Sequence, residues 1–468
     1  MADYAMTIDG VAVPGTSSFD VLDPATNDVL GQAPECSREQ LDEAMSAAAN
    51  AFPVWSVDAT GRGRALEAAA DLLDAAVDEL APLLTGEQGK PLADARTELR
   101  GGAARLRYAS TLRLEPEVLQ DDEQAYAELV RRPYGTVAAI APWNAPVIIA
   151  MAKVGPALAA GNTVVLKPSP YTPLTTLRVG ELLQEVLPAG VLSVISGSSG
   201  ELGQAMIEHR VPRMVDFTGS VRTGKAVAAA AAPDLKRVTL ELGGNDPAIV
   251  LDDADPGEIA EQLFWGAFAN CGQVCVAIKR LYVPRASYDG FVDALASVAS
   301  AVKVGPGLEE GVTMGPLNNV PQLRHVEQLV DDALRHGAVA ASGGGRMQGP
   351  GNFFAPTVLA GVADGTAIVD DEQFGPALPV IPYDSLDEAL ARANATHFGL
   401  GGSVWAKDVE RASDVAGRLA CGTAWVNSHR VLASHLPFTG HKWSGYGGNS
   451  GIEGFHEFTE GQVVWRKR

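Results

Sequence analysis

Short apolar runs alternate with amphipathic, helix-like segments from residue 135 onward. Runs rich in β-branched residues lie at 135–143, 162–169, 191–197, 213–220 and 237–244. The segments between them carry apolar residues three and four positions apart, as in PVIIAMAKVGPALAAG and TTLRVGELLQEVL. This alternation predicts a mostly parallel sheet with helices on both faces, and such sheets bind nucleotides at the carboxyl ends of their strands.

A second α/β pattern begins after residue 245 with PAIVLDDAD, and the Ala-rich segments before residue 90 are helical by periodicity. A chain of 468 residues is too long for one hydrophobic core. We therefore expect an α/β fold with two Rossmann-like, doubly wound domains. The first domain is predicted to span 1–114 and 135–242, and the second to span 243–440.

The segment EPEVLQDDEQAYAELVRRPYG alternates around a turn-like DDEQ, which predicts a small β-hairpin arm over 115–134. The last residues, EGQVVWRKR, read as a further strand within 455–468. Exposed strand edges need partners. Pairing of the arm between subunits is the expected solution.

Composition and charge exclude several classes of protein. With 46% hydrophobic and 20% charged residues, the chain is typical of soluble globular enzymes. A net charge of −21 opposes binding to nucleic acid or to anionic lipid, so neither partner is expected. No signal peptide or membrane-length apolar stretch is visible, and four cysteines do not make a disulfide scaffold. These features favour a cytoplasmic protein.

Several strand ends carry residues that suit catalysis or ligand binding, and each of these residues also has a purely structural interpretation. Glu241 in ELGGN suits general-base work in a crowded site, or is a strand-end Glu bonded to backbone. Asn144 in APWNAP can donate to an oxyanion, or is a turn residue. Lys167 in KPS reaches a ribose or phosphate, or lies on the surface. In FTGSVRTG, Gly219 and Gly224 allow close approach of a pyrophosphate, although this motif alone is weak.

Cys271 and Cys275 in FANCGQVC raise the question of a metal site, a disulfide or a nucleophile. A zinc site needs further ligands nearby, and no histidine or second Cys pair is close in sequence, so no metal is predicted. A disulfide across this spacing has poor geometry. A small buried apolar cysteine and a thiolate nucleophile both remain open on this local evidence.

Seven motifs occur in the order and spacing of the aldehyde dehydrogenase superfamily, which the chain resembles over nearly its whole length. The motifs are PWNAP, KPS, FTGSVRTG, ELGGN, FANCGQVC, EQFGP and PFTGHKWSG. The strongest signature places the nucleophile 34 residues after the glutamate of Glu-Leu-Gly-Gly, the separation of Glu241 and Cys275. The resemblance therefore assigns Cys275, and not Cys271, as the nucleophile.

The resemblance implies oxidation of a small-molecule aldehyde to its acid through a Cys275 thiohemiacetal and thioester. It places Asn144 and the Cys275 backbone N–H at the oxyanion, makes Glu241 the base for hydrolysis, and adds Lys153 to the catalytic set. It also implies NAD or NADP as cofactor, an NAD(P)-binding first domain, a catalytic second domain and a homodimer or homotetramer. The cofactor-binding residues implied are Trp143, Lys167, Ser169, Gly219, Ser220, Gly224, Leu242, Glu372 and Phe374.

Three departures from the superfamily pattern change the expectation. Pro170 stands where many NAD-preferring relatives carry a glutamate that repels a 2′-phosphate, so NADP use is a hypothesis. Arg222 adds positive charge near the phosphates. Asn449 replaces a glutamate thought to help protons leave, which predicts slower release of the acyl group.

The predicted substrate tunnel combines small and apolar residues, namely Ala145, Ile148, Ala152, Ala269, Val274 and Phe438. Three of these are alanines where small-aldehyde relatives carry aromatic rings, which predicts a bulky or aromatic aldehyde. Alternatively, the loop 428–436 fills the gap, and its Arg430, His429 and His435 read the acidic or polar tail of a semialdehyde. A CoA-acylating relative is disfavoured because Glu241 is present. A cysteine hydrolase would not need the cofactor motifs, and a silent homologue would have lost Cys275 or Glu241.

Overall fold

An eight-stranded sheet forms the centre of the first half of the computed structural model, which describes residues 4–468. The strand order is β19-β11-β10-β7-β8-β9-β1-β2. Its five parallel strands are β7 (Thr136–Ile140), β8 (Thr163–Lys167), β9 (Leu192–Val194), β10 (Met214–Thr218) and β11 (Arg237–Glu241). The antiparallel strands β1 (Met6–Ile8), β2 (Val11–Val13) and β19 (Gly445–Tyr446) complete the two edges.

The chain reverses its direction across this sheet between β7 and β10. Helices α5 (Pro146–Ala160) and α6 (Leu174–Leu183) connect β7, β8 and β9 in one direction. Helices α7 (Gly200–Glu208) and α8 (Val221–Ala231) lead back to β10 and β11 on the other side of β7. Because such crossovers are right-handed, the two helix pairs cover opposite faces. The loops after β7 and β10 therefore flank the switch point, where open sheets bind ligands.

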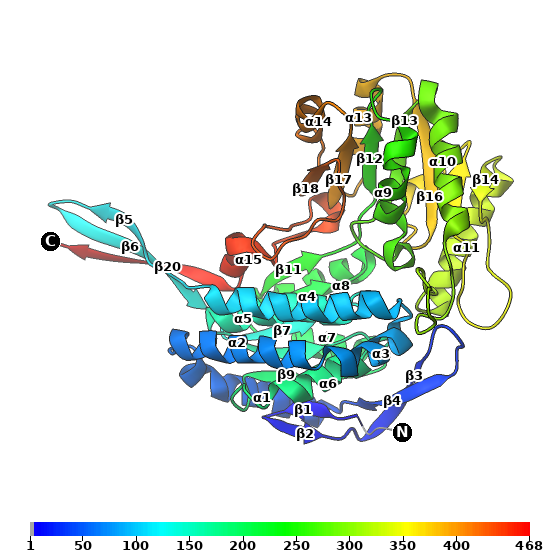
Figure 1. Ribbon diagram of the computed structural model, residues 1–468. Helices are drawn as coiled ribbons and strands as arrows, with labels where there is room; N and C mark the ends of the chain where they lie inside the picture. The colour runs from blue at the N-terminus through cyan, green and yellow to red at the C-terminus, as the bar shows by residue number, and fades with distance from the viewer. Residues whose placement is uncertain (1–3) are drawn as a thin grey trace.

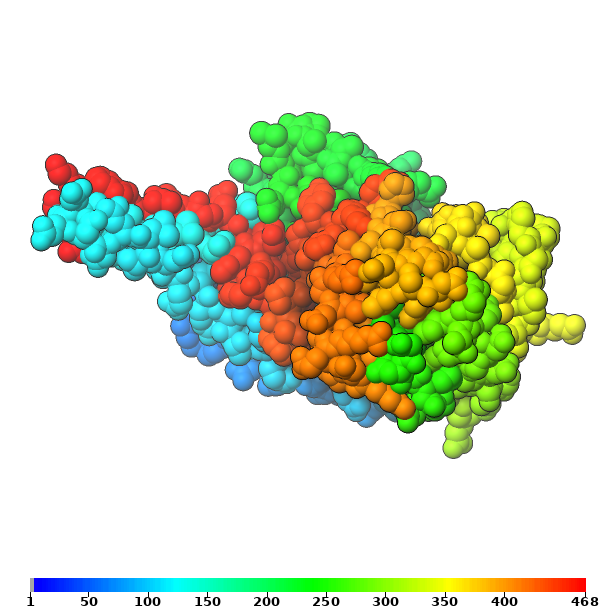
Figure 2. Space-filling view, turned by 90° about the horizontal axis from the view of Figure 1, so that it is seen from above, coloured from blue at the N-terminus to red at the C-terminus, as the bar shows by residue number. Residues whose placement is uncertain are grey.

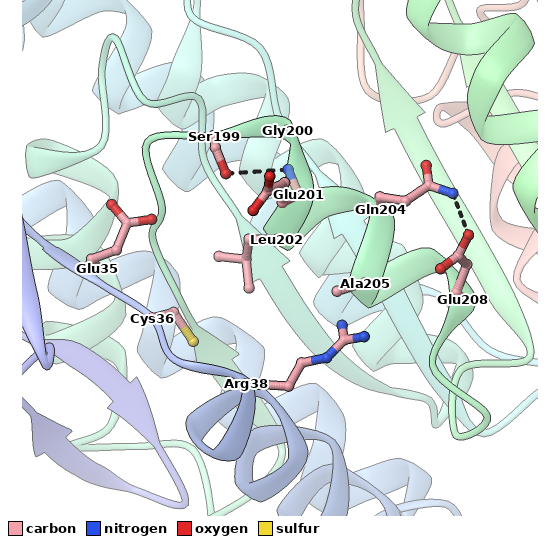
Figure 3. A pocket seen from close by; sticks show the side chains of 10 residues that line it. All are labelled: Glu35, Cys36, Arg38, Ser199, Gly200, Glu201, Leu202, Gln204, Ala205 and Glu208. Atoms are coloured by element: carbon pink, nitrogen blue, oxygen red, sulfur yellow. Dashed lines mark hydrogen bonds between the residues drawn. The ribbon is translucent and has the colours of Figure 1, made fainter.

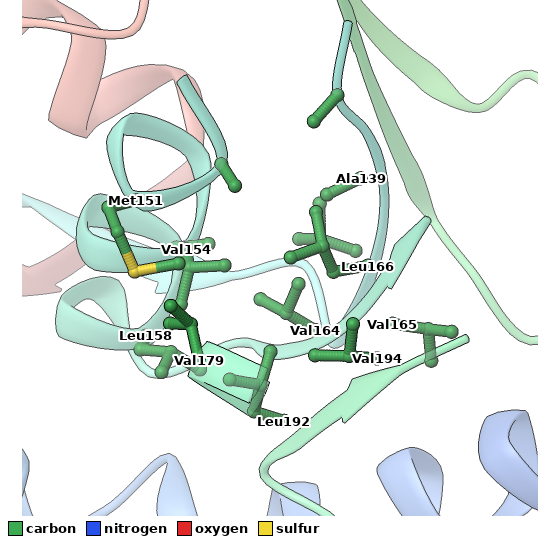
Figure 4. Packing of buried hydrophobic residues seen from close by; sticks show 14 of the residues in the cluster. Ala139, Met151, Val154, Leu158, Val164, Val165, Leu166, Val179, Leu192 and Val194 are labelled. Atoms are coloured by element: carbon green, nitrogen blue, oxygen red, sulfur yellow. The ribbon is translucent and has the colours of Figure 1, made fainter. Parts of the chain in front are cut away.

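Four N-terminal helices pack around the first sheet. They are α1 (Arg38–Trp55), α2 (Ala59–Ala75), α3 (Val77–Gln88) and α4 (Leu92–Thr111). Helix α1 packs on the sheet itself, and the other three pack on helices or on one another. The first three lie in the Ala-rich segments that the sequence predicts to be helical, and the fourth was not predicted. The predicted helical stretch 61–89 divides into α2 and α3 at Ala76. Helix α4 packs against α2 and α5, so α5 is enclosed between helices and the sheet. Figure 4 shows the resulting core, in which Met151, Val154 and Leu158 of α5 face Val164 and Leu166 of β8.

A seven-stranded sheet forms the second half of the chain, in the order β14-β15-β16-β13-β12-β17-β18. Its parallel strands are β12 (Asp246–Val250), β13 (Ile278–Pro284), β15 (Thr357–Ala360), β16 (Ala377–Tyr383), β17 (Gly401–Trp405) and β18 (Thr423–Val426), with antiparallel β14 (Val339–Ser342) at one edge. The accompanying helices are α9 (Pro256–Phe268), α10 (Tyr288–Ala301), α11 (Val320–Arg335), α12 (Ala367–Asp370), α13 (Leu386–Asn394) and α14 (Val409–Ala416). The mixed α/β class with parallel sheets is confirmed.

A three-stranded arm projects from the body of the molecule (Figure 1). It consists of β5 (Glu117–Asp121), β6 (Ala125–Pro133) and the C-terminal β20 (Thr459–Lys467). Figure 2 shows the hairpin β5–β6 and the terminal strand side by side and separate from the body. Trp465 is 58% exposed on β20, whose outer backbone edge has no neighbouring strand within residues 4–468.

The chain returns to the first sheet before it enters the arm. Strand β19 pairs with β11, and α15 (Gly451–Glu457) packs against α5. A further hairpin, β3 (Ser17–Leu22) with β4 (Val29–Glu35), lies near the N-terminus. None of the helices in residues 4–468 has the length and apolar character needed to span a membrane.

Candidate active site

A cavity of about 270 Å³ contains the thiol of Cys275 and draws residues from both sheets. Its walls come from the loops after β7, β10 and β11 and from the loops before β13 and β16. The residues that line it include Trp143, Asn144, Gly219, Ser220, Leu242, Cys275, Gln322, His325, Glu372 and Phe374. The cavity thus lies at the switch point of the first sheet and faces the second.

Cys275 lies in a short loop that packs on Leu400 and Trp425. The pKa of its thiol is raised to about 12, mainly by burial and in smaller part by nearby carboxylates including Glu241, while the Lys279 ammonium opposes the rise. The thiol is therefore protonated at neutral pH in this environment. A nucleophilic role requires a base that removes its proton.

The turn before Cys275 explains the glycine in the motif. Cys271 and Gly272 have φ values of 58° and 70°, and a Cβ on Gly272 would lie 2.2 Å from the carbonyl oxygen of Gly375. Gln273 fixes the loop, because its side-chain amide donates to the Asn270 carbonyl at 2.9 Å. Cys271 is 1% exposed, so it packs in the core of the second sheet and takes no part in the cavity.

Asn144 is held by three hydrogen bonds, two with the cysteine loop and one with Lys90. Its side-chain Nδ2 donates to the carbonyl oxygen of Gln273 at 2.9 Å. Its own backbone carbonyl accepts from Lys90 Nζ at 3.0 Å and from Asn270 Nδ2 at 2.9 Å. The amide of asparagine has two N–H groups, so one of them is still available to a ligand in the cavity.

Glu241 ends β11 with its side chain buried. Burial raises the pKa of the carboxyl to about 8, Asp216 adds to this rise, and Lys153 and Arg105 oppose it. Its Oε1 has no hydrogen-bond partner in the part of the chain that the structure describes. A carboxyl that titrates near neutral pH and is not committed to the protein suits general-base chemistry.

Lys153 does not reach the cavity. Its Nζ lies 2.6 Å from Oδ1 of Asp216, and both side chains are fully buried. The ammonium affects Glu241 through its charge, since it lowers the pKa of that carboxyl. Lys153 therefore influences the predicted base Glu241 through its charge and does not contact a ligand in the cavity.

The loop after β10 provides a narrow approach for a ligand backbone. A Cβ on Gly219 would lie 2.5 Å from the ring of Phe217, so only glycine fits. Ser220 caps α8 by accepting from the N–H of Thr223 at 3.3 Å. A Cβ on Gly224 would meet the Leu242 side chain at 2.5 Å, which brings α8 close to the end of β11. This cradle suits a pyrophosphate.

The opposite wall of the cavity is aromatic and acidic. The rings of Trp143 and Phe374 meet edge to face, with centroids 5.3 Å apart. Glu372 accepts from the Gly244 N–H at 3.0 Å and lies 3.2 Å from Lys279 Nζ. A Cβ on Gly243 would overlap the Glu372 carboxylate, so the two glycines of ELGG allow this approach.

Lys167 and Ser169 lie outside the cysteine cavity, at the end of β8. Lys167 is 5% exposed, and burial lowers the pKa of its ammonium to about 8 while Glu35 opposes the change. Within residues 4–468 its Nζ donates one long hydrogen bond, of 3.3 Å, to the carbonyl oxygen of Pro168. Ser169 Oγ accepts from the Tyr171 N–H at 3.3 Å. A buried ammonium with so little hydrogen bonding fits a place where a polar ligand such as a ribose binds.

A separate open groove of about 820 Å³ lies beside this region (Figure 3). It runs between the segment that contains Glu35 and Arg38 and the start of α7. Glu35 accepts from the N–H of Ser198 with both oxygens at 3.1 Å. None of the residues that line this groove lines the cysteine cavity.

The predicted tunnel residues divide into three groups. Val274 and Phe438 pack against the same small cluster as Cys275, formed by Val276, Leu400 and Trp425. Ile148 lies against α4, where a Cβ on Gly101 would be 2.6 Å from its Cδ1, and Ala152 lines a narrow crevice with Arg105.

Ala145 precedes α5, and Ala269 begins the short helical turn before Cys271. Neither residue lines the cysteine cavity. In the loop 428–436, His429 is bonded to the Val276 carbonyl at 2.8 Å with its side chain 1% exposed. His429 is thus a packing residue and is not available to read a substrate tail.

The sequence pattern missed the residues that hold this site together. Lys90, Gln273, Lys279, His325 and Asp216 all contact the predicted residues. Gln273 lies within the motif FANCGQVC but was given no role, and the other four lie outside the quoted motifs. One signal was available, since Asp216 is a lone acid in the buried run MVDFT. The others have no local signature.

The fold and the site together define a class, the NAD(P)-dependent oxidoreductases with a doubly wound nucleotide-binding sheet. The model of the "Aldehyde dehydrogenase family" matches residues 12–464. The chain belongs to the aldehyde dehydrogenase family.

Its relatives include semialdehyde dehydrogenases. Glutarate-semialdehyde dehydrogenase of Pseudomonas aeruginosa is 37% identical over 97% of this chain and 95% of the relative. The NADP(+) succinate-semialdehyde dehydrogenase of Escherichia coli is 37% identical over 95% of this chain and 93% of the relative. The solved NAD+ complex of aldehyde dehydrogenase from Bacillus cereus superposes with a TM-score of 0.97 at 36% identity, covering 100% of this chain and 97% of that one.

Proposed function

We propose that this protein oxidises an aldehyde to its carboxylic acid with NAD(P)+ through a covalent intermediate on Cys275. The observation that carries the proposal is the cavity in which Cys275 and Asn144 face a glycine-lined cradle. The buried carboxyl of Glu241 does not line this cavity, but its charge acts on the Cys275 thiol. Family membership supplies the reaction class, and the geometry supplies a role for each residue.

The first step is addition of the Cys275 thiolate to the aldehyde carbon. Glu241 is the base that removes the thiol proton, because its charge acts on the Cys275 thiol and its buried Oε1 has no hydrogen-bond partner within residues 4–468. The new S–C bond displaces the carbonyl π electrons onto oxygen. The free amide N–H of Asn144 and the backbone N–H of Cys275 donate to that oxyanion.

The chemistry that NAD(P)+ supplies when bound is acceptance of the hydride that leaves the tetrahedral carbon. Cys275 then holds the acyl group as a thioester. Before hydrolysis Glu241 gives up to solvent the proton that it took from the thiol. It then takes a proton from water, whose oxygen attacks the thioester carbon, and the C–S bond breaks to release the carboxylic acid and the Cys275 thiolate.

We assign the cofactor to the residues that surround the cavity and the adjoining strand end. Gly219 and Ser220 lie at the pyrophosphate, with Gly224 and Leu242 shaping the helix beneath it. Trp143 and Phe374 enclose the nicotinamide, and Glu372 binds its ribose. Lys167 and Ser169 hold the adenosine ribose, where Pro170 leaves room for either NAD or NADP.

We propose a bulky or aromatic aldehyde as substrate, because Ala145 follows Asn144 and Ala269 precedes the cysteine loop with small side chains outside the cavity wall, and Ala152 lines the crevice with Arg105. A semialdehyde with an acidic tail is the second candidate. It is supported by Arg430, whose buried Nε has no hydrogen-bond partner among residues 4–468, with Asp94 as its nearby opposite charge. The semialdehyde dehydrogenases among the relatives point the same way.

We also propose the domain division and the assembly. Residues 1–114 and 135–242 form the NAD(P)-binding domain, 243–440 the catalytic domain, and 115–134 with 455–468 the arm. The exposed β20 edge pairs with a second subunit in a homodimer or homotetramer. The protein acts in the cytoplasm.

The test is formation of reduced nicotinamide, followed by its absorbance, with aldehydes from acetaldehyde to benzaldehyde and short semialdehydes. Each substrate is run with NAD and with NADP, beside Cys275→Ala. We expect activity with at least one pair and none in the variant. Activity that survives Cys275→Ala overturns the covalent mechanism, and higher kcat/KM for small aliphatic aldehydes than for aromatic or acidic ones rejects both substrate classes.

A further inference from the structure

Asp216 is a charged residue in the middle of the buried strand β10. Its side chain is fully buried beside Lys153, which comes from α5. A buried ion pair in a sheet contributes little net stability compared with apolar residues of the same size. Its position next to the reaction centre therefore calls for a reason other than stability.

Register places Asp216 on the same face of the sheet as Glu241. In the parallel pairing of β10 with β11, Asp216 is opposite Thr239, and Thr218 is opposite Glu241. Side chains two residues apart on a strand share a face, and so do residues directly opposite each other. These four side chains consequently form one polar patch, with Lys153 packed on it.

The patch contains polar atoms that the protein does not satisfy. Glu241 Oε1, Thr218 Oγ1 and Thr239 Oγ1 are all buried without a hydrogen-bond partner in the described part of the chain. Buried polar atoms grouped in this way are typically bridged by ordered water. Such a bridge would connect Glu241 to Asp216 across one pair of neighbouring strands.

On the side of Asp216 away from Glu241, the next polar residue is Asn449. The side-chain amide of Asn449, oriented so that its nitrogen donates, lies 3.2 Å from Oδ2 of Asp216. Asn449 lines the narrow crevice that also contains Arg105, Ala152 and Ser434. The exit from Asp216 to this crevice is short and polar.

We propose that Asp216, paired with Lys153, is the positioning residue that carries the hydrolytic proton of Glu241 toward the Asn449 crevice. This inference rests on the proposed function. When the thioester is hydrolysed, Glu241 gains one proton from water. That proton passes through the patch to the Asp216 carboxylate and leaves at the crevice to bulk solvent, which restores both carboxylates without any further reactant.

The position of the carboxylate is the distinctive feature. The sequence has Asn449 where relatives carry a glutamate, which predicts slow acyl release. Asp216 places a carboxylate beside Lys153 from strand β10, so release of the acyl group need not be slow.

The first experiment is Asp216→Asn, with a pre-steady-state burst, the steady-state kcat and the pH profile of kcat as readouts. We expect a full burst of reduced cofactor, a kcat about 10-fold lower, and a pH midpoint shifted downward, because the Asp216 charge raises the Glu241 pKa. Asp216→Ala combined with Asn449→Glu returns a carboxylate to Lys153 from the other side and should restore most of the kcat that Asp216→Ala loses.

Thr239→Val tests the same path without leaving Lys153 unpaired, and Ser193→Ala is its matched control. Ser193 also has a buried hydroxyl without a partner, in β9 of the same sheet, away from the patch. We expect Thr239→Val to lower kcat about three-fold with the burst intact, and Ser193→Ala to leave both unchanged. An unchanged kcat and pH profile in Asp216→Asn and Thr239→Val overturns the inference, as does equal loss of burst and turnover. Failure of the proposed function would instead appear in the wild type, as absence of activity that depends on Cys275.

Discussion

The ammonium of Lys90 lies 3.0 Å from the backbone carbonyl oxygen of Asn144 and donates a hydrogen bond to it. The same ammonium forms a buried ion pair with Glu98, whose Oε1 accepts from the Val147 N–H at 2.9 Å. One charged pair therefore fixes both the proposed oxyanion donor and the first turn of α5.

Lys90→Met should destabilise the protein by about 3–5 kcal/mol, because it leaves the Glu98 carboxylate buried and unpaired. Urea denaturation measures the change, and kcat/KM should fall as Asn144 shifts. The matched control is Arg285→Met, which breaks the exposed pair with Asp384 and should leave the stability almost unchanged, because solvent screens this pair. Equal effects of the two variants would contradict this account.

Glu241→Gln should separate the two halves of the reaction when Cys275 is acylated at alkaline pH. We expect a burst close to one equivalent of reduced cofactor, followed by turnover at least about 100-fold slower, since the hydrolytic water lacks its base. Rapid-mixing absorbance measures both phases. Cys275→Ala should show neither phase, and wild-type turnover in Glu241→Gln would remove this residue from the mechanism.

The activity should rise with pH as Glu241 ionises. Its pKa of about 8 in the folded protein means that the base form increases up to and beyond that pH. Where hydrolysis limits the rate, the kcat profile should have a midpoint near pH 8. The same limb should be missing from Glu241→Gln.

Stability should move in the opposite direction across the same window. The folded protein keeps the Glu241 proton to about pH 8, whereas the unfolded chain loses it near 4.5. The folded state therefore binds more protons between these values, and stability falls as pH rises through them. Denaturation of the wild type and of Glu241→Gln at several pH values measures this dependence. As the pH rises, the free energy of unfolding of the wild type should fall relative to that of the variant.

Pro170→Glu should shift cofactor preference toward NAD. A carboxylate next to the strand end of Lys167 repels a 2′-phosphate by about 1–2 kcal/mol, or roughly 10-fold in relative kcat/KM. Steady-state kinetics with both cofactors measures the ratio, and Pro170→Gln controls for size. A similar shift in the uncharged control would show that charge is not the cause.

The motifs predicted from the sequence are contiguous because strand ends and turns use adjacent residues. The positive φ at Gly272 and the close approaches at Gly219 and Gly243 require glycine locally, so their spacing is visible in the chain. The alternation of strands and helices likewise follows from side-chain periodicity. These local features determined the fold class, the strand-end site residues and the family.

Only the tertiary structure decided which distant residues meet. Lys90 and Asn144 are 54 positions apart, and Asp216 reaches Lys153 from 63 positions away. Such pairs depend on strand order and helix packing, which leave no periodic trace in the sequence. The buried environment that raises the Glu241 pKa is also a product of packing, because desolvation depends on all the neighbours at once.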